Sequence, residues 1–99
     1  MLNITKNTNA SELTVSLTGR LDTVTAPELE KELKASLDGV SALTIDMAAL
    51  EYISSAGLRV LLSAQKTMNK QGEMKVVHVG ETIMEIFEVT GFSDILSIE

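Results

Sequence analysis

The sequence predicts an α/β domain built on a small mixed sheet, mostly parallel, in the order ββαβαβαβ, with its helices stacked on one face. Segments of alternating apolar and polar residues, typical of strands, are followed by segments whose apolar residues recur at helical spacing. A chain of 99 residues with 44% hydrophobic content suits a single domain with one core over residues 1–99. Right-handed crossovers that each lead to the next neighbouring strand would place every helix on the same face.

The first two predicted strands form a hairpin. They cover residues 2–6 and 12–18, and the segment 7–11 between them is rich in residues typical of turns. The second strand alternates leucine and valine with serine and threonine, which indicates one covered face and one face toward water. A third strand at 44–47 repeats this alternation.

Three helices are expected after the hairpin. The first begins near Thr25 or Ala26, because Thr25 has capping-box spacing and the residue before Pro27 resists helical dihedral angles. Leucines repeat along its buried side, and Gly39 ends it. The elements after the third strand are a loop up to a pair of serines, a helix at about 56–71, a strand at 74–79, a helix at 81–90 and a short strand at 95–98.

The composition excludes several classes of function. Fourteen acidic against eight basic side chains give a formal net charge of −6, whereas direct binding of nucleic acid normally needs a basic face. The chain has no cysteine, so disulfides, zinc–thiolate sites and thiol redox chemistry are absent. No signal-peptide pattern and no apolar run near the roughly 20 residues of a membrane span is present, which predicts a cytoplasmic protein.

Ser54 and Ser55 lie where the predicted loop meets the second helix, and they are the chemical lead. A serine there can cap free backbone N–H groups, and from position alone capping of the second helix is the simpler interpretation of Ser55. The same helix end also favours an anion such as phosphate. Arg59, one helical turn after Ser55, could pair with a phosphate there, or equally with Glu51 or solvent.

Asp22 and Asp46 are each expected at the carboxyl end of a strand, on parallel neighbours. That edge is where open α/β sheets place their sites, so both carboxylates could flank Ser55. In the alternative interpretation Asp22 accepts hydrogen bonds from its own turn and Asp46 caps loop amides. Two carboxylates without a third ligand make a weak metal site, and we predict no metal and no cofactor.

The loop before the serines contains Leu50, Tyr52 and Ile53. Such apolar residues usually pack beneath the loop, but an exposed tyrosine and its aliphatic neighbours also make common interface anchors. Gly57 is expected to let a partner backbone approach the first helical turn closely. His78 is the only histidine, and neither a G-x-S-x-G elbow nor a glycine-rich phosphate loop is present, so we predict that the chain is not an enzyme.

Several of these residues together resemble the signature of STAS domains, in particular the anti-sigma factor antagonists. The resemblance rests on Asp46, Leu50, Tyr52-Ile53 and the run Ser54–Leu58, and Gly19–Asp22 and the order of elements extend it over the whole chain. It implies the same fold and identifies Ser55 as the phosphate acceptor. Where the family usually has aspartate before the acceptor, this chain has Ser54.

The resemblance also implies a mechanism. The unmodified domain would bind an anti-sigma factor that is also a serine kinase, phosphorylation of Ser55 would release it, and a serine phosphatase would reset the switch. The alternative is a STAS scaffold module that is never phosphorylated and sits in a larger assembly. The expected partner-binding residues are Asp22, Asp46, Tyr52, Ile53, Ser54, Ala56, Gly57 and Arg59.

Overall fold

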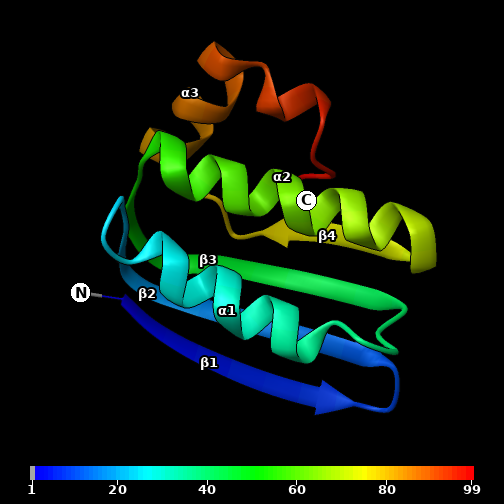
Figure 1. Cartoon of the computed structure of the whole chain (residues 1–99). Coiled ribbons are helices and arrows are strands. Elements are labelled where there is room, and N and C mark those ends of the chain that lie inside the picture. Colours follow the sequence, from blue (N-terminus) through cyan, green and yellow to red (C-terminus); the bar gives the residue numbers. More distant parts are fainter. Residues whose placement is uncertain (1) are drawn as a thin grey trace.

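The computed structural model describes residues 2–99 and confirms the fold class (Figure 1). The sheet has the order β1-β2-β3-β4, in which β1 is antiparallel to β2 and the other neighbours are parallel. The elements are β1 (Leu2–Asn9), β2 (Glu12–Leu21), α1 (Ala26–Ser36), β3 (Ala42–Ile53), α2 (Ser55–Gln71), β4 (Glu73–Val77), α3 (Glu81–Thr90) and the 3₁₀ turn η1 (Phe92–Asp94).

The hairpin is confirmed, with longer strands than predicted. Pairing runs from Leu2 opposite Gly19 to Asn9 opposite Glu12, so the polar residues assigned to the turn lie in the strands. Only two residues remain for the turn, and Ala10 takes a φ of 56° there. Asparagine and threonine are common in turns, but here Asn7, Thr8 and Asn9 are exposed residues at the end of an edge strand.

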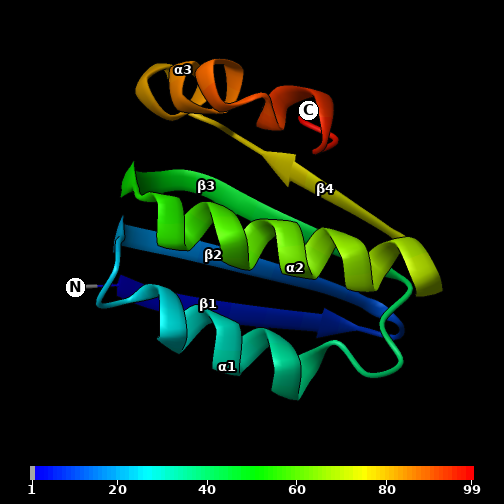
Figure 2. The ribbon, with the colours of Figure 1, turned by 45° about the horizontal axis from the view of Figure 1, so that its top comes forward.

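One face of the sheet is covered and the other is open, as predicted. The strand side chains on the covered face are almost fully buried, among them Leu17, Leu43, Ile45 and Met74. The residues that alternate with them in β2 and β3 are polar and half-exposed. Helices α1 and α2 lie across the covered face, and α3 lies beyond β4, at the edge of the sheet opposite β1 (Figures 1 and 2).

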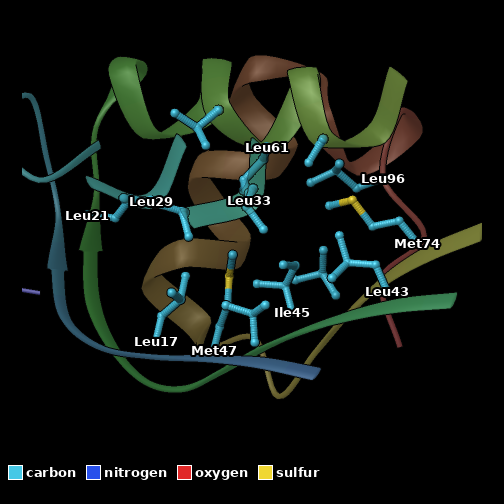
Figure 3. Close-up of a cluster of buried hydrophobic side chains, with 14 of the residues drawn as sticks. Leu17, Leu21, Leu29, Leu33, Leu43, Ile45, Met47, Leu61, Met74 and Leu96 are labelled. Carbon is cyan, nitrogen blue, oxygen red and sulfur yellow. The ribbon is translucent and has the colours of Figure 1, made fainter. Parts of the chain in front are cut away.

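The core between helices and sheet is mainly aliphatic and includes methionine side chains (Figure 3). Its largest fully buried side chains come from every layer: Leu29 from α1, Leu61 and Met68 from α2, Met47 from β3 and Phe87 from α3. Each such side chain contributes roughly 1.5–3 kcal/mol on burial. This shared core holds the helix ends in place at the edge where the strands end.

The prediction of a loop before the serines is wrong, because β3 continues through these residues to Ile53. Two irregularities in the β2–β3 register each add one residue to β3, between Asp46 and Ala49 and between Leu50 and Tyr52. Such bulges break the alternation of buried and exposed residues by which a strand is recognised in a sequence.

The chain after β4 also differs from the prediction. His78 takes a φ of 57° and ends β4 at Val77, two residues early. The last predicted strand is reduced to one parallel bridge between Val76 and Ile98, because η1 takes up the residues that precede it. No helix within residues 2–99 combines the length and the apolar character needed to cross a membrane.

The start of α1 decides between Thr25 and Ala26 as its cap, and its end lies slightly before the predicted one. Helix α1 begins at Ala26, with Thr25 in the cap position but without a capping side-chain hydrogen bond. It ends at Ser36, and Gly39 lies in the following turn with a φ of 81°. That left-handed conformation is the one for which glycine is suited.

Candidate functional site

Ser54 is the N-cap of α2. Its Oγ accepts a hydrogen bond from the backbone N–H of Gly57 at 3.4 Å, and its carbonyl accepts the N–H of Leu58 at 2.9 Å. Its own N–H donates to the carbonyl of Leu21 at 2.9 Å, which ties the start of α2 to the end of β2. Ser54 is therefore the cap of α2, and the interpretation that made Ser55 the cap is wrong.

Ser55 is the first residue of α2 and is exposed. Within residues 2–99 its hydroxyl makes no hydrogen bond, so it serves no structural contact that a modification would break. The unpaired N–H groups of the first turn and the helix dipole favour negative charge at this place. The two serines thus divide the tasks: Ser54 closes the helix end and Ser55 presents a free hydroxyl.

Gly57 lies on the inner side of the same turn. A Cβ at this position would stand 2.7 Å from Cγ of Leu21 and 2.9 Å from Cγ1 of Ile53, closer than real contacts allow. Glycine is needed here for packing against the core, and its part in admitting a partner backbone stays a prediction. Ile53 is only 2% exposed, so the prediction that it contacts a partner directly is also wrong.

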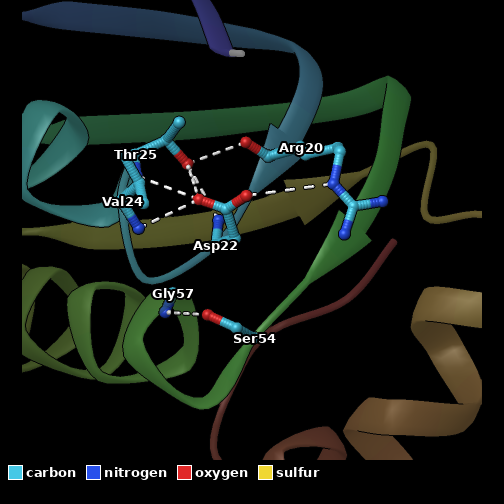
Figure 4. A network of polar contacts seen from close by, with 6 residues as sticks. All are labelled: Arg20, Asp22, Val24, Thr25, Ser54 and Gly57. Atoms are coloured by element: carbon cyan, nitrogen blue, oxygen red, sulfur yellow. Dashed lines mark hydrogen bonds and ion pairs between the residues drawn. The ribbon is translucent and has the colours of Figure 1, made fainter.

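Asp22 lies in the turn between β2 and α1, next to the start of α2 (Figure 4). Its Oδ1 accepts hydrogen bonds from the N–H groups of Val24 and Thr25, both at 3.0 Å, and from the Thr25 hydroxyl at 3.2 Å. The bond from the Thr25 N–H is the main cause that lowers the pKa of Asp22 below its usual range, helped by the Thr25 hydroxyl and the Val24 N–H. Asp22 thus stabilises its own turn, as in the alternative interpretation. It lies directly after the carboxyl end of β2, as predicted.

Asp46 is not at a strand end, and its predicted place beside Ser55 is wrong. It pairs with Ser16 in the register, whereas the end of β3 at Ile53 pairs with Leu21. That separation is on the order of 15 Å along the strand. The strand end could not be located from the sequence because the bulges hide the continuation of β3.

Asp46 instead forms a pair that the sequence did not suggest. Its Oδ1 accepts a hydrogen bond from the Ala48 N–H at 3.0 Å and lies 3.0 Å from Nδ1 of His78. The Ala48 N–H is the main cause that lowers the pKa of Asp46, with His78 adding to it. The lone histidine is therefore engaged on Asp46, away from Ser55.

Tyr52 is 37% exposed at the end of β3. The guanidinium of Arg20 lies 4.4 Å from the centre of its ring, and Nε of Arg20 lies 3.8 Å from Oδ2 of Asp22. Arg20 was missed by the sequence analysis. The contact between Arg20 and Tyr52 follows from the β2–β3 register, which places the two residues opposite each other. That register depends on the bulges.

Ala56 and Arg59 extend the surface toward α1. With Thr23, Pro27 and other residues they line a shallow groove between the starts of α1 and α2. Arg59 is exposed and forms no ion pair within residues 2–99, so the alternative pairing with Glu51 is not formed, and its pairing with a phosphate on Ser55 stays a prediction. We call the group of exposed and half-buried residues around the serines the α2-edge surface, made of Asp22, Tyr52, Ser54, Ser55, Ala56 and Arg59.

Comparisons with known proteins bear on this surface. The family model described as the STAS domain matches residues 2–99. BtrV of Bordetella bronchiseptica, named as a candidate anti-sigma factor antagonist, is 38% identical over 88 residues, covering 87% of this chain and 76% of BtrV. The anti-sigma-B factor antagonist of Bacillus subtilis is 29% identical over 98 residues, covering 98% of this chain and 90% of that protein.

A solved structure agrees with these relatives. The crystal structure of an anti-sigma factor antagonist from Mycobacterium paratuberculosis superposes with a TM-score of 0.89 at 28% identity, covering 99% of this chain and 85% of the other. The similarity in sequence and in structure thus extends over nearly the whole chain, the α2-edge surface included.

Proposed function

This chain belongs to the STAS-domain family, and from that premise we propose that it is an anti-sigma factor antagonist controlled by phosphorylation of Ser55. In its unmodified form it binds an anti-sigma factor in the cytoplasm and thereby frees a sigma factor. The anti-sigma factor is also a serine kinase, which modifies Ser55 and is released. A serine phosphatase restores the binding form.

The observation that carries this proposal is the division of tasks between the two serines. Ser54 caps α2 in the place where the family usually has aspartate, and both residue types are strong N-caps. Ser55 keeps an exposed hydroxyl that no other part of residues 2–99 engages. A kinase can therefore reach Ser55 without first breaking the helix end.

The chemistry at Ser55 needs nothing catalytic from this chain. Its Oγ attacks the γ-phosphorus of an ATP held by the partner kinase, the bond to ADP breaks, and the hydroxyl proton leaves to a base of the kinase. The chain is the substrate of this transfer and uses no cofactor or metal of its own. The product places about −1.5 to −2 charges at the start of α2.

The same phosphate has opposite effects in the free domain and in the complex. In the free domain the start of α2 favours the anion by about 0.3–1 kcal/mol, so the fold persists. In the interface it faces desolvation and repulsion, and a mispaired buried charge costs about 2–5 kcal/mol. That range corresponds to a loss of affinity of roughly thirty- to several-thousand-fold.

We assign the partner contacts to the α2-edge surface. Its exposed Tyr52 and Arg59 provide an aromatic and a charged anchor on either side of Ser55. Ile53 and Gly57 act from beneath by fixing the position of the turn. Asp46 lies on the open face of the sheet, and its part in partner binding stays a prediction from the family resemblance.

The test is phosphate transfer followed by intact mass. The chain is incubated with ATP and a candidate anti-sigma kinase, beside the matched variants Ser54→Ala and Ser55→Ala. We expect one phosphoryl group on the parent and on Ser54→Ala, and none on Ser55→Ala, which should still bind the kinase. Equal phosphorylation of Ser55→Ala would move the acceptor elsewhere.

A second experiment separates charge from shape. Ser55→Asp adds one negative charge, which is less than the charge of a phosphate. It should weaken the anti-sigma complex, but less than phosphorylation does, while the melting temperature stays near that of the parent. Raising the salt concentration should restore only part of the affinity, because a buried charge is poorly screened. Parent-like affinity at low salt would refute the electrostatic mechanism.

The scaffold alternative is favoured by one observation, the presence of Ser54 where the family usually has aspartate. Two results together would support the scaffold instead of the switch. Kinases that bind the chain would transfer no phosphate to it, and Ser55→Asp would bind its partner with the affinity of the parent.

A further inference from the structure

The net negative charge of this protein comes almost entirely from its C-terminal end. Residues 81–99 contain five of the 14 acidic side chains and no lysine, arginine or histidine. The preceding 80 residues contain the other nine acidic and all eight basic side chains, so they are nearly neutral. Almost all of the formal net charge of −6 therefore belongs to α3 and the segment after it.

Helix α3 is apolar on two sides. Ile83 and Phe87 face the core and are buried. On the outer side Val89 is 87% exposed, the highest value among the large apolar residues of residues 2–99. Together with Thr82, Glu85, Ile86 and Thr90 it lines a shallow depression, and we call these five residues the outer α3 surface.

Two of the three carboxylates of α1 are paired with lysines, whereas those on the outer side of α3 are not. In α1, Glu32 pairs with Lys6 at 2.7 Å and Glu30 with Lys34 at 3.6 Å. The exposed Glu85 and Glu88 form no ion pair within residues 2–99. Glu88 also lies in the last turn of α3, where no basic residue is present and the helix dipole disfavours negative charge.

We propose that the outer α3 surface docks a basic amphipathic helix of a partner protein. Ile86 and Val89 lie one helical turn apart and offer an apolar stripe, on which the apolar face of a second helix can pack. Lysine or arginine side chains flanking that face would meet Glu85 and Glu88. The partner would cover the exposed valine and neutralise the charge at the end of α3.

The charges on the outer α3 surface argue against the other occupants. A second copy of this chain that packed with the same surface would bring Glu85 and Glu88 of both copies together, and facing like charges are repulsive. An anionic membrane surface attracts basic segments and repels acidic ones. The surface is separate from the α2-edge surface, so the proposal stands or falls independently of phosphorylation at Ser55.

The test uses a synthetic helical peptide of leucine and lysine in amphipathic order, titrated into the ¹⁵N-labelled full chain. We expect the largest amide shifts at Ile86, Val89 and Thr90, and no binding by the same peptide with glutamate in place of lysine. The matched variants are Val89→Ser and Val24→Ser, since Val24 is similarly exposed at 80% but lies in the β2–α1 turn.

Val89→Ser should weaken the peptide by about tenfold, because it removes about 1.4 kcal/mol of apolar burial. The double charge reversal Glu85→Lys, Glu88→Lys should weaken it by about tenfold or more, and Val24→Ser should leave the affinity unchanged. Unchanged melting temperatures would show that the variants fold. Because Val89 and both glutamates are exposed, folding should be preserved.

Three outcomes overturn the proposal. Peptide shifts that map to other elements, or that persist in Val89→Ser and in the charge reversal, place the binding elsewhere. A dimer of the chain alone in sedimentation velocity, abolished by Val89→Ser, assigns the surface to a second copy. Co-sedimentation with anionic phospholipid vesicles, abolished by the same variant, assigns it to a membrane. None of these outcomes bears on Ser55.

Discussion

The two sides of the first turn of α2 obey different constraints. On the inner side, Gly57 leaves no room for even one more carbon between the helix and the side chains of Leu21 and Ile53. On the outer side, Ser55 and Arg59 are exposed and unengaged within residues 2–99. Residues two positions apart thus differ in whether any change is tolerated. A regulatory group can be added outside because the turn is held from inside.

Gly57→Val should have the largest effect on stability. A β-branched side chain would collide with Cγ of Leu21 and Cγ1 of Ile53, and overpacking of this kind costs about 1–3 kcal/mol or more. We expect the melting temperature to fall by at least roughly 4–8 °C in a thermal scan.

The control for Gly57→Val is Ser55→Val, which places the same side chain on the outer side of the turn. It should melt within a few degrees of the parent. If the two variants melt alike, the two sides do not differ and the packing argument is wrong.

Ser54→Ala should have an intermediate effect, because Ser54 belongs to neither side and closes the end of the helix. Losing its hydrogen bond from the Gly57 N–H costs about 1 kcal/mol. Ser54→Asp should preserve the stability, since aspartate caps equally well and adds charge at the favourable end of the dipole. Chemical denaturation at neutral pH measures both, and a loss in Ser54→Asp as large as that in Ser54→Ala would contradict the capping role.

Asp22→Asn should change the pH dependence of stability. Hydrogen bonds from the Thr25 N–H, first, then from the Thr25 hydroxyl and the Val24 N–H lower the folded pKa of Asp22 below its ordinary value of 3.8. The ionised group therefore stabilises the fold above that value, and the contribution is lost as the pH falls through the lowered pKa.

Melting curves from neutral pH down through the ordinary pKa test this. We expect the parent to be more stable than Asp22→Asn at neutral pH and the two curves to converge in acid. Asn keeps a carbonyl acceptor for the turn, so the variant isolates the ionised form. Parallel curves at all pH values would mean that the Asp22 charge does not stabilise the turn.

Ser55→Ala should have the smallest effect on stability. The hydroxyl makes no contact within residues 2–99, and exposed substitutions of this kind usually stay within about 0.5 kcal/mol. Denaturation midpoints equal to those of the parent, beside a lost phosphate transfer, would show that the outer side serves function alone. A loss near that of Ser54→Ala would give Ser55 a structural part as well.

Asp22 and Asp46 show how far the sequence predicts the site. Both were assigned to strand ends by the same argument. The argument holds for Asp22, because a turn and a proline-containing helix start follow at once. It fails for Asp46, because β3 continues through two bulges whose extra residues leave no periodic signal. Local chemistry is visible in the sequence, whereas strand length depends on the neighbour it pairs with.

The sequence by itself determined the order of the elements up to α3, the covered face of the sheet and the serine pair at the start of α2. These follow from local periodicity and from residue types at helix ends, which need no knowledge of distant contacts. Only the tertiary structure decided which serine caps the helix, why position 57 must be glycine, and that His78 pairs with Asp46. Each of these depends on atoms that register and packing bring together, and the register of a bulged strand is set by its partner.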